Sequence, residues 1–347
     1  MDRKIFIDES FDIYERLSLL GAISIPDKII DILSNKDILF LNKYSATSYS
    51  KLMFRNLSGK NIEKNLDKSK DYFDWFIKSV RLLNEQFKVN IIDFTSLKDK
   101  KEMDGYHYLV YNKLPERLVY GFLKHDKSNG FSNIRIYVDS SYRYVKYDMS
   151  SYLKNQLNAT AIYRNLNYKI NKVETIYKNI NELSYVKRNK LKSKYVEKMG
   201  NIFENLVLEY KNNNEKKRSR FHKSIISNFD RIMNLSVEKN RVTKKDRLSS
   251  RNSFGVSIID FILNIVRVIK IINTLPTHYR GAKPLNNYKP LMRNGDMIFY
   301  LLKKKEVRDI LCNIRLFELN GHEEMYLKSF KDDVDFFTAL WGKNYEI

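Results

Sequence analysis

The sequence predicts an α/β fold in which helices flank a mixed sheet, with a basic helical-hairpin insertion and a helical C-terminal extension. Three observations indicate this fold. Short apolar runs end in aspartate at Asp8 and Asp139, apolar residues recur at helical spacing between these runs, and positive charge rises sharply over residues 171–250. The chain has 347 residues, 43% of them hydrophobic, which is enough for a large core.

The first half of the chain alternates between strand and helix patterns. We expect five strands, at residues 3–9, 17–25, 89–94, 133–139 and 168–177. The first two are close in sequence, and Pro26 closes the second, so they form an antiparallel hairpin. Helical periodicity predicts helices at 27–34, at 62–87, at 103–123 with an interruption near Pro115, and from Met149 through Leu157.

The second half of the chain is predicted to be mainly helical. Two amphipathic stretches within 185–240, broken at Asn212–Asn214, suggest a helical hairpin. An apolar run around Asp260 predicts a helix reaching Ile272, and two further helices are expected at 295–318 and 323–341. The predicted organisation is a core over 1–180, a basic insertion over 181–250, a core helix over 251–272 and a helical extension over 273–347.

Cysteine content and hydropathy limit the class of protein. Cys312 is the only cysteine, which excludes internal disulfides and thiolate zinc sites and favours a reducing cytoplasm. The sequence contains no run of ~18 uncharged apolar residues, so no membrane span is predicted. The charged N-terminal strand does not resemble a signal peptide. We therefore expect a cytoplasmic protein that does not engage a membrane.

Positive charge is concentrated in one part of the chain. The net charge is +22; residues 1–100 hold 17 Lys/Arg and 15 Asp/Glu, whereas residues 171–250 hold 20 and 9. This concentration predicts RNA or DNA as the partner. An anionic membrane surface and the lysine bias of an AT-rich genome are alternative explanations.

The basic insertion supplies the candidate nucleic-acid-binding residues. Cations on a projecting helix pair can follow a phosphate backbone, whereas the interleaved aromatic residues fit better as the seam of the hairpin. The apolar stripe could equally dock a second protomer, so a homo-oligomer or partner protein is expected at the insertion or the C-terminal helices. The candidate residues are Lys187, Arg188, Lys190, Lys194, Lys216, Lys217, Arg218, Arg220, Lys244 and Lys245.

Three aspartates follow or interrupt apolar segments: Asp8, Asp139 and Asp260. An ionised carboxylate there is costly unless it is paired or binds a metal. Two Mg²⁺ or Mn²⁺ ions ~3.5–4 Å apart could activate water and stabilise the leaving oxygen of a phosphodiester. We expect Asp8 to bridge the ions and Asp139 and Asp260 to hold one each, with Glu9 as a fourth ligand or outer base.

A purely structural role for these aspartates is the alternative. Asp8 and Asp139 would then only end their strands, and Asp260 would cap a helix or pair with a lysine. Asp93 also lies in a predicted strand and could join the three aspartates, but a role at the strand end or in a salt bridge is favoured over a metal site.

The chain resembles the bacterial domain-of-unknown-function-3800 family over approximately 1–180 and 250–272. The resemblance rests on F-I-D-E-S, L-L-G-A-I-S-I-P, I-Y-V-D and S-F-G-V-S-I-I-D-F-I. It implies a ribonuclease-H-like fold, which the predicted order of elements also matches, and a metal-dependent nuclease cutting RNA or DNA in phage defence or a mobile element. Asp8, Asp139 and Asp260 match the family's acidic positions, and Glu9 and Ser10 match the rest of its first motif.

The chain departs from the family pattern at two positions. Phe11 stands where the family has glycine after D-E-S, and Ser257 replaces the glutamine of the late Q-L-A-D motif. These departures keep a second function open: a catalytically inert nucleic-acid-binding or assembly subunit of a defence complex.

Overall fold

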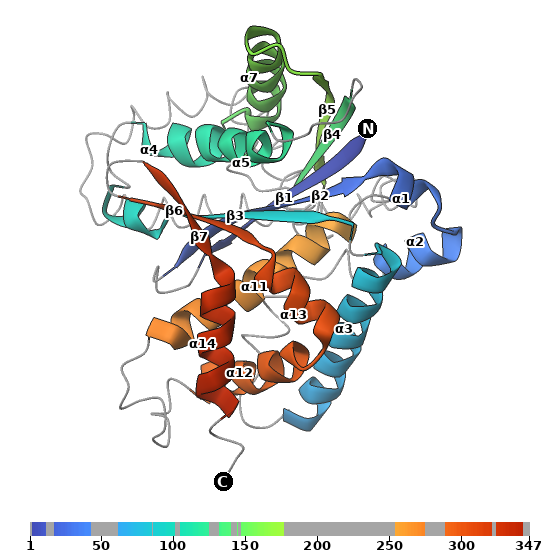
Figure 1. The fold of residues 1–347 in the computed structure, drawn as a ribbon, viewed down its shortest axis with the longest axis vertical. Helices are drawn as coiled ribbons and strands as arrows, with labels where there is room; N and C mark the ends of the chain where they lie inside the picture. Colours follow the sequence, from blue (N-terminus) through green and yellow to red (C-terminus); the bar gives the residue numbers. More distant parts are fainter. Residues whose placement is uncertain are drawn as a thin grey trace, which may run out of the picture. The chain divides into compact units, whose positions relative to one another are not determined.

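One mixed sheet organises the molecule, with strand order β5-β4-β1-β2-β3-β6-β7 (Figure 1). The computed structural model describes residues 2–11, 17–42, 62–84, 86–100, 105–124, 132–139, 144, 147–176, 254–274, 289–320 and 324–342. All of them belong to one unit, formed by Met1–Lys178 and Arg251–Ile347. The strands are β1 (Arg3–Phe11), β2 (Ser18–Pro26), β3 (Lys88–Asp93), β4 (Ser132–Asp139), β5 (Tyr168–Ile176), β6 (Arg315–Leu319) and β7 (Met325–Ser329).

The strand directions make the sheet mixed. β1 and β2 form the predicted antiparallel hairpin, and β3 continues it antiparallel to β2. On the other side of β1, β4 and β5 run parallel to it. β6 runs parallel to β3, and β7 turns back antiparallel to β6. All five predicted strands are present, and the prediction of an α/β fold is confirmed.

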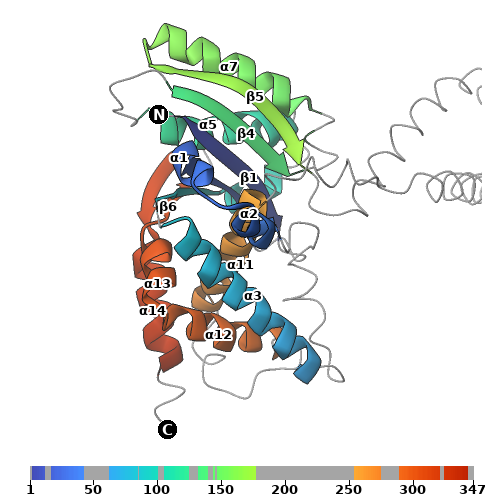
Figure 2. The same cartoon turned by 90° about the vertical axis from the view of Figure 1, so that its right-hand side faces the viewer.

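Helices cover both faces of the sheet (Figure 1). On one face lie α5 (Leu114–Leu123) and α7 (Met149–Tyr163). In the sequence, α4 (Tyr106–Tyr108) and a π-helix (Leu109–Lys113) lead directly into α5. Figure 2 shows α7 lying along β5. On the other face lie α3 (Ile62–Leu82), α11 (Phe254–Thr274), α12 (Lys289–Leu302), α13 (Lys305–Cys312) and α14 (Phe330–Gly342). The short helices α1 (Asp27–Asp31) and α2 (Asn35–Leu41) follow β2.

Strand alternation divides the apolar residues between two cores. Phe6 on β1 and Ile23 on β2 join the core beneath α11, whereas Ile5 and Ile7 join the core beneath α5 and α7. Because both faces are covered, β2 is buried along its whole length and reads as a continuous apolar run.

Helix α11 is apolar around most of its circumference because it lies between the sheet and other helices. Phe261 on α11 packs against Phe76 on α3, with ring centroids 4.4 Å apart. Gly255 lies so close to β1 that a Cβ there would be 2.2 Å from ring atoms of Phe6. Among the described residues, no helix has the length and hydropathy needed to cross a bilayer.

The prediction of a wholly helical C-terminal extension is wrong. Residues 315–319 and 325–329, expected within helices, form β6 and β7 and extend the core sheet from β3. A helix was expected as far as residue 318, but pairing with β3 holds residues 315–319 as a strand. The predicted helical hairpin at 185–240 lies outside the described residues.

Candidate functional site

The parallel pairing of β1 and β4 brings two of the three predicted aspartates to neighbouring positions. Ile7 pairs with Val138, and the next residues of the two strands are Asp8 and Asp139. Asp139 still belongs to β4, where it pairs with Ile176 of β5. Its side chain lies outside the described part of the structure. Parallel strands in register orient paired residues toward the same face, so the sequence positions suit a shared site.

Asp8 faces the layer that contains α11. Phe6, two residues earlier, has its ring 5.4 Å from that of Phe254 on α11. Strand alternation gives Asp8 the same side and Glu9 the opposite side, because β1 continues as a strand to Phe11. Asp8 is buried, with 1% of its surface exposed, whereas Glu9 is partly exposed. The structure therefore does not bring Glu9 to the same side as Asp8.

Gly21 lets α11 approach the sheet beside Asp8. It is the antiparallel partner of Asp8 on β2, and a Cβ at this position would be 2.8 Å from Leu263 and 3.0 Å from Ile259. A side chain on Gly21 would thus require Leu263 or Ile259 to move. Because Ile259 meets the partner of Asp8 directly, Asp260 is one residue from that crossing point. The helix that carries the third predicted aspartate therefore passes the position of the first.

Buried polar side chains form a stripe along α11 around Asp260. Asp260 is 8% exposed, and Asn264 Nδ2 donates to its backbone oxygen at 2.9 Å and to its Oδ1 at 3.3 Å. Arg267 Nη2 donates to Asn264 Oδ1 at 3.0 Å. One turn before Asp260, the buried Ser257 Oγ has no hydrogen-bond partner among the described residues. A polar stripe in an apolar helix is costly and suggests a function beyond packing.

The donor atoms at this site are of the kind that Mg²⁺ or Mn²⁺ prefers. Asp8 on β1 and Asp260 on α11, the helix that packs on this strand, are both buried carboxylates. Hard divalent cations bind carboxylate oxygens. Among the described side chains, no group of three or more His, Cys, Asp or Glu could hold a metal ion. Because the Asp139 side chain is not among them, the predicted set of three aspartates stays a prediction.

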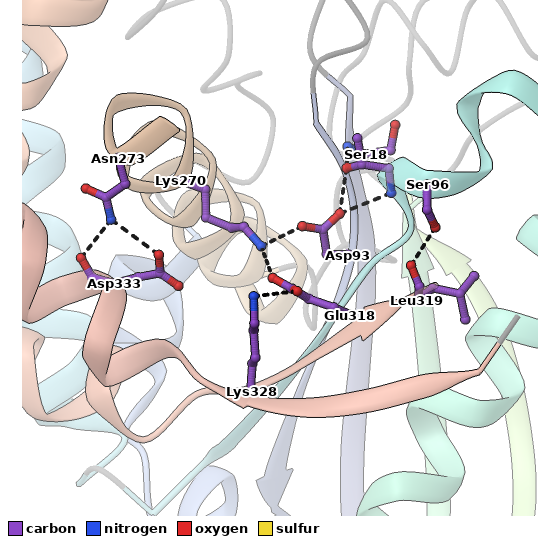
Figure 3. A network of polar contacts seen from close by, with 10 residues as sticks. Ser18, Asp93, Ser96, Lys270, Asn273, Glu318, Leu319, Lys328 and Asp333 are labelled. Atoms are coloured by element: carbon purple, nitrogen blue, oxygen red, sulfur yellow. Dashed lines mark hydrogen bonds and ion pairs between the residues drawn. The ribbon is translucent and has the colours of Figure 1, made fainter. Parts of the chain in front are cut away.

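A separate charged cluster joins α11 to the ends of β3 and β6. Lys270 Nζ lies 2.6 Å from Asp93 Oδ2 and 2.7 Å from Glu318 Oε1, and Lys328 Nζ lies 2.7 Å from Glu318 Oε2 (Figure 3). Thr95 donates to Asp93 Oδ1 through its amide and its hydroxyl. The predicted salt bridge of Asp93 is confirmed. Sequence reasoning did not identify Lys270, although a lysine between apolar residues 268–269 and 271–272 was a visible signal.

The cluster shifts the pKa of Lys270 and of Glu318. Burial alone would lower the pKa of Lys270, but the charges and hydrogen bonds of Asp93 and Glu318 outweigh it and raise the pKa above its ordinary 10.5. Burial alone would raise the pKa of Glu318, but hydrogen bonds from Lys270 and Lys328 outweigh it and lower the pKa below its ordinary 4.5. Both shifts favour the charged forms of Lys270 and Glu318, which suits an ion pair between the helix and the sheet.

The predicted nucleic-acid-binding residues, from Lys187 to Lys245, lie outside the described residues. Comparisons with known proteins do not assign the chain: no family model matches it, and neither a curated protein nor a solved structure is detectably similar.

Proposed function

We propose that the protein is a metal-dependent nuclease of ribonuclease-H-like fold that hydrolyses phosphodiester bonds in RNA or DNA. The observation that carries the proposal is the register of β1 and β4, which gives Asp8 and Asp139 adjacent positions beside the crossing point of α11. Strand alternation gives position 139 the same face of β4 as Tyr137, whose ring stacks on Phe6 with ring centroids 5.1 Å apart.

The strand order supports the finer assignment of the fold. A hairpin β1-β2 extended by β3, with β4 and β5 added parallel on the other side of β1, is the arrangement expected of a ribonuclease-H-like sheet. The motifs that resemble the domain-of-unknown-function-3800 family fall on β1, β2, β4 and α11, which are the elements around Asp8. We extend the proposal to a role in phage defence or a mobile element, which rests on that resemblance alone, and to a cytoplasmic setting, which rests on the single cysteine.

The protein's own groups would perform two tasks. Asp8, Asp139 and Asp260 would hold the metal, and Asn264 would orient Asp260 through its side-chain amide. Bound Mg²⁺ or Mn²⁺ would supply the chemistry, activating water and neutralising charge on the phosphate. Glu9, on the opposite face of β1, is left out of the proposed ligand set.

Asp8→Asn tests the proposal, with Asp71→Asn on an exposed turn of α3 as the control. Cleavage of labelled RNA and DNA is measured with Mg²⁺, with Mn²⁺ and with EDTA, and folding is followed by thermal melting. We expect Mg²⁺- or Mn²⁺-dependent cleavage in the parent and in Asp71→Asn, and none in a folded Asp8→Asn protein. Cleavage that persists in EDTA or in Asp8→Asn contradicts the proposal.

Metal binding gives a readout that is independent of cleavage. Mn²⁺ should raise the melting temperature of the parent, because a ligand that binds only the folded state stabilises it. This rise should be lost in Asp8→Asn and in Asp260→Asn. An equal rise in all three proteins would place the metal elsewhere.

A further inference from the structure

The contact between α5 and α7 carries a continuous series of aromatic and charged side chains on the face opposite α11. Tyr108 OH and Tyr152 OH are 3.1 Å apart, and Tyr152 OH donates to Glu116 Oε2 at 3.0 Å. Lys113 Nζ lies 5.3 Å from the ring centroid of Tyr152 and 3.1 Å from Glu116. We use the name aromatic seam for Tyr108, Lys113, Tyr120, Tyr152, Tyr163 and Arg164.

The π-helix explains why Tyr108 and Lys113 lie close together in this part of the seam. In a π-helix residues five apart are aligned, and Lys113 Nζ accordingly lies 5.9 Å from the ring centroid of Tyr108. In an α-helix these two positions would point in clearly different directions. The wide turn therefore places a cation and two tyrosine rings together at the surface.

A groove of about 360 Å³ lies at the other end of the seam, between α5 and α7. Its lining includes Arg117, Tyr120, Tyr163 and Arg164. Arg164 Nη1 donates to Tyr120 OH at 2.9 Å, and its guanidinium carbon lies 5.4 Å from the centroid of that ring. Tyr163 is 89% exposed. The groove thus combines fixed cations with a flat ring that is open to solvent.

One end of the seam lies toward the carboxyl end of β4, the strand that carries Asp139. Helix α7 follows Asp139, the last residue of β4, so its first turn lies at the carboxyl end of that strand, and Tyr163 lies at its far end. Near the first turn three rings lie almost parallel. His107 is tilted 14° from Tyr147 and 15° from Tyr111, with centroids 5.2 and 6.0 Å apart. His107 is exposed, so a flat surface lies at the end of the seam nearer Asp139.

The structure assigns the aromatic seam to single-stranded nucleic acid, led along α5 and α7 toward the carboxyl end of β4. Tyrosine rings stack on unpaired bases, and Lys113, Arg117 and Arg164 outnumber Glu116 and suit a phosphate backbone. Base faces in a duplex are already stacked on one another, so these rings would gain nothing from it. The assignment rests on the proposed function for its ligand class, and it narrows that class to unpaired strands.

Equilibrium binding tests the assignment. Fluorescein-labelled oligo-dT, oligo-U and a duplex of equal length are titrated with protein in EDTA, so that no metal-dependent cleavage can occur. Tyr163→Ala should weaken binding of the single strands roughly 5- to 150-fold, the effect of one stacked base, and leave duplex binding within about twofold. Tyr163→Phe keeps the ring and should bind as the parent does. Ile162→Ala, at a neighbouring residue that is 83% exposed, is the matched control.

The outcomes test the assignment of the aromatic seam separately from the proposal that the protein is a nuclease. Equal binding of single strands by the parent and Tyr163→Ala, or equal loss in Ile162→Ala, overturns the assignment whatever the cleavage assay gives. Tyr163-dependent binding in a protein that never cleaves supports the seam and contradicts only the nuclease. A difference between oligo-dT and oligo-U in their response to Tyr163→Ala identifies which nucleic acid the seam favours.

Discussion

Lys270 is the residue whose removal should cost most among the charged side chains of α11. It is 11% exposed and holds together Asp93, which is 10% exposed, and Glu318. Lys270→Met keeps the apolar stem but removes the cation that Asp93 and Glu318 share, leaving Glu318 with only the exposed Lys328. We expect the free energy of unfolding in urea to fall by about 3–5 kcal/mol, as when one partner of a buried ion pair is removed.

Lys328→Met is the matched control for this change. Lys328 also pairs with Glu318, but its side chain is 58% exposed, and such pairs contribute about 1 kcal/mol or less. Equal losses for the two variants would show that burial does not set the strength of the cluster.

The lowered pKa of Glu318 predicts a loss of stability in acid. The unfolded chain takes up a proton near the ordinary pKa of 4.5, whereas the folded protein does so only at lower pH. Stability from this group is therefore present above pH 4.5 and is lost as pH falls through the folded-state pKa. In Lys270→Met the folded pKa should move back toward 4.5. Urea titrations between about pH 3 and 6 should then show a shallower decline for Lys270→Met than for the parent.

At the level of elements, the approach of α11 to β1 depends on Gly255. An alanine Cβ there would lie 2.2 Å from the Phe6 ring, which is itself stacked on Tyr137. We expect Gly255→Ala to lower the free energy of unfolding by about 1–3 kcal/mol through overpacking. Helix propensity alone predicts the opposite, a gain of up to about 1 kcal/mol. Urea denaturation decides between them, with the exposed Thr274→Ala on the same helix as control.

Phe6→Leu provides a second check on this contact. If the ring is what an alanine at 255 meets, the double variant should lose less stability than the sum of the two single changes. Additive losses would mean that Gly255 acts through the helix backbone rather than through its contact with β1.

Local patterns predicted the elements that local interactions determine. The apolar runs of β1 to β5 and the periodicity of α3, α7 and α11 were sufficient. The interruption expected near Pro115 is not a break: the chain remains helical, and only the helix type changes from π to α before this proline. β6 was not predictable in this way, because its partner β3 lies more than 200 residues earlier. The closeness of Gly21 and Gly255 to their partners likewise depends on a packing that no local pattern contains.

The residues of the candidate site also fall into two groups: those that a local pattern indicated and those that only the folded structure brings together. The sequence indicated Asp8, Asp139 and Asp260 because each is a carboxylate beside an apolar run, and it indicated the salt bridge of Asp93. It could not identify Lys270 as the partner of Asp93, since they are 177 positions apart. It did not indicate the aromatic seam, whose members come from α4, the π-helix, α5, α7 and the residue after α7 and are separated by up to 56 positions.

For the molecule as a whole, the uneven distribution of charge predicts where polyanion affinity resides. Reversing four basic residues of the insertion to glutamate should weaken nucleic-acid binding by orders of magnitude. It should also reduce the slope of log K against log salt, since each phosphate contact contributes roughly 0.7–0.9. Salt-dependent fluorescence anisotropy measures both effects. The four residues are Lys216, Lys217, Arg218 and Arg220.

A control with the same change in net charge separates the effect of where the charges lie from the effect of total charge on nucleic-acid binding. It reverses four exposed lysines of the described core, and it should alter binding far less. If both sets weaken binding equally, overall charge rather than the insertion controls affinity. The control residues are Lys28, Lys36, Lys88 and Lys305.

The dependence of the sheet on α11 and β6 also has a consequence for synthesis on the ribosome. Asp260 is made 252 residues after Asp8, which at 5–20 residues per second is a delay of roughly 10–50 s. During this delay the nascent chain carries the α11 side of β1 and β2 uncovered and the edge of β3 unpaired. Such a chain is a natural client for chaperones that bind exposed apolar strands. Any activity that needs Asp260 can begin only after residue 260 has been translated.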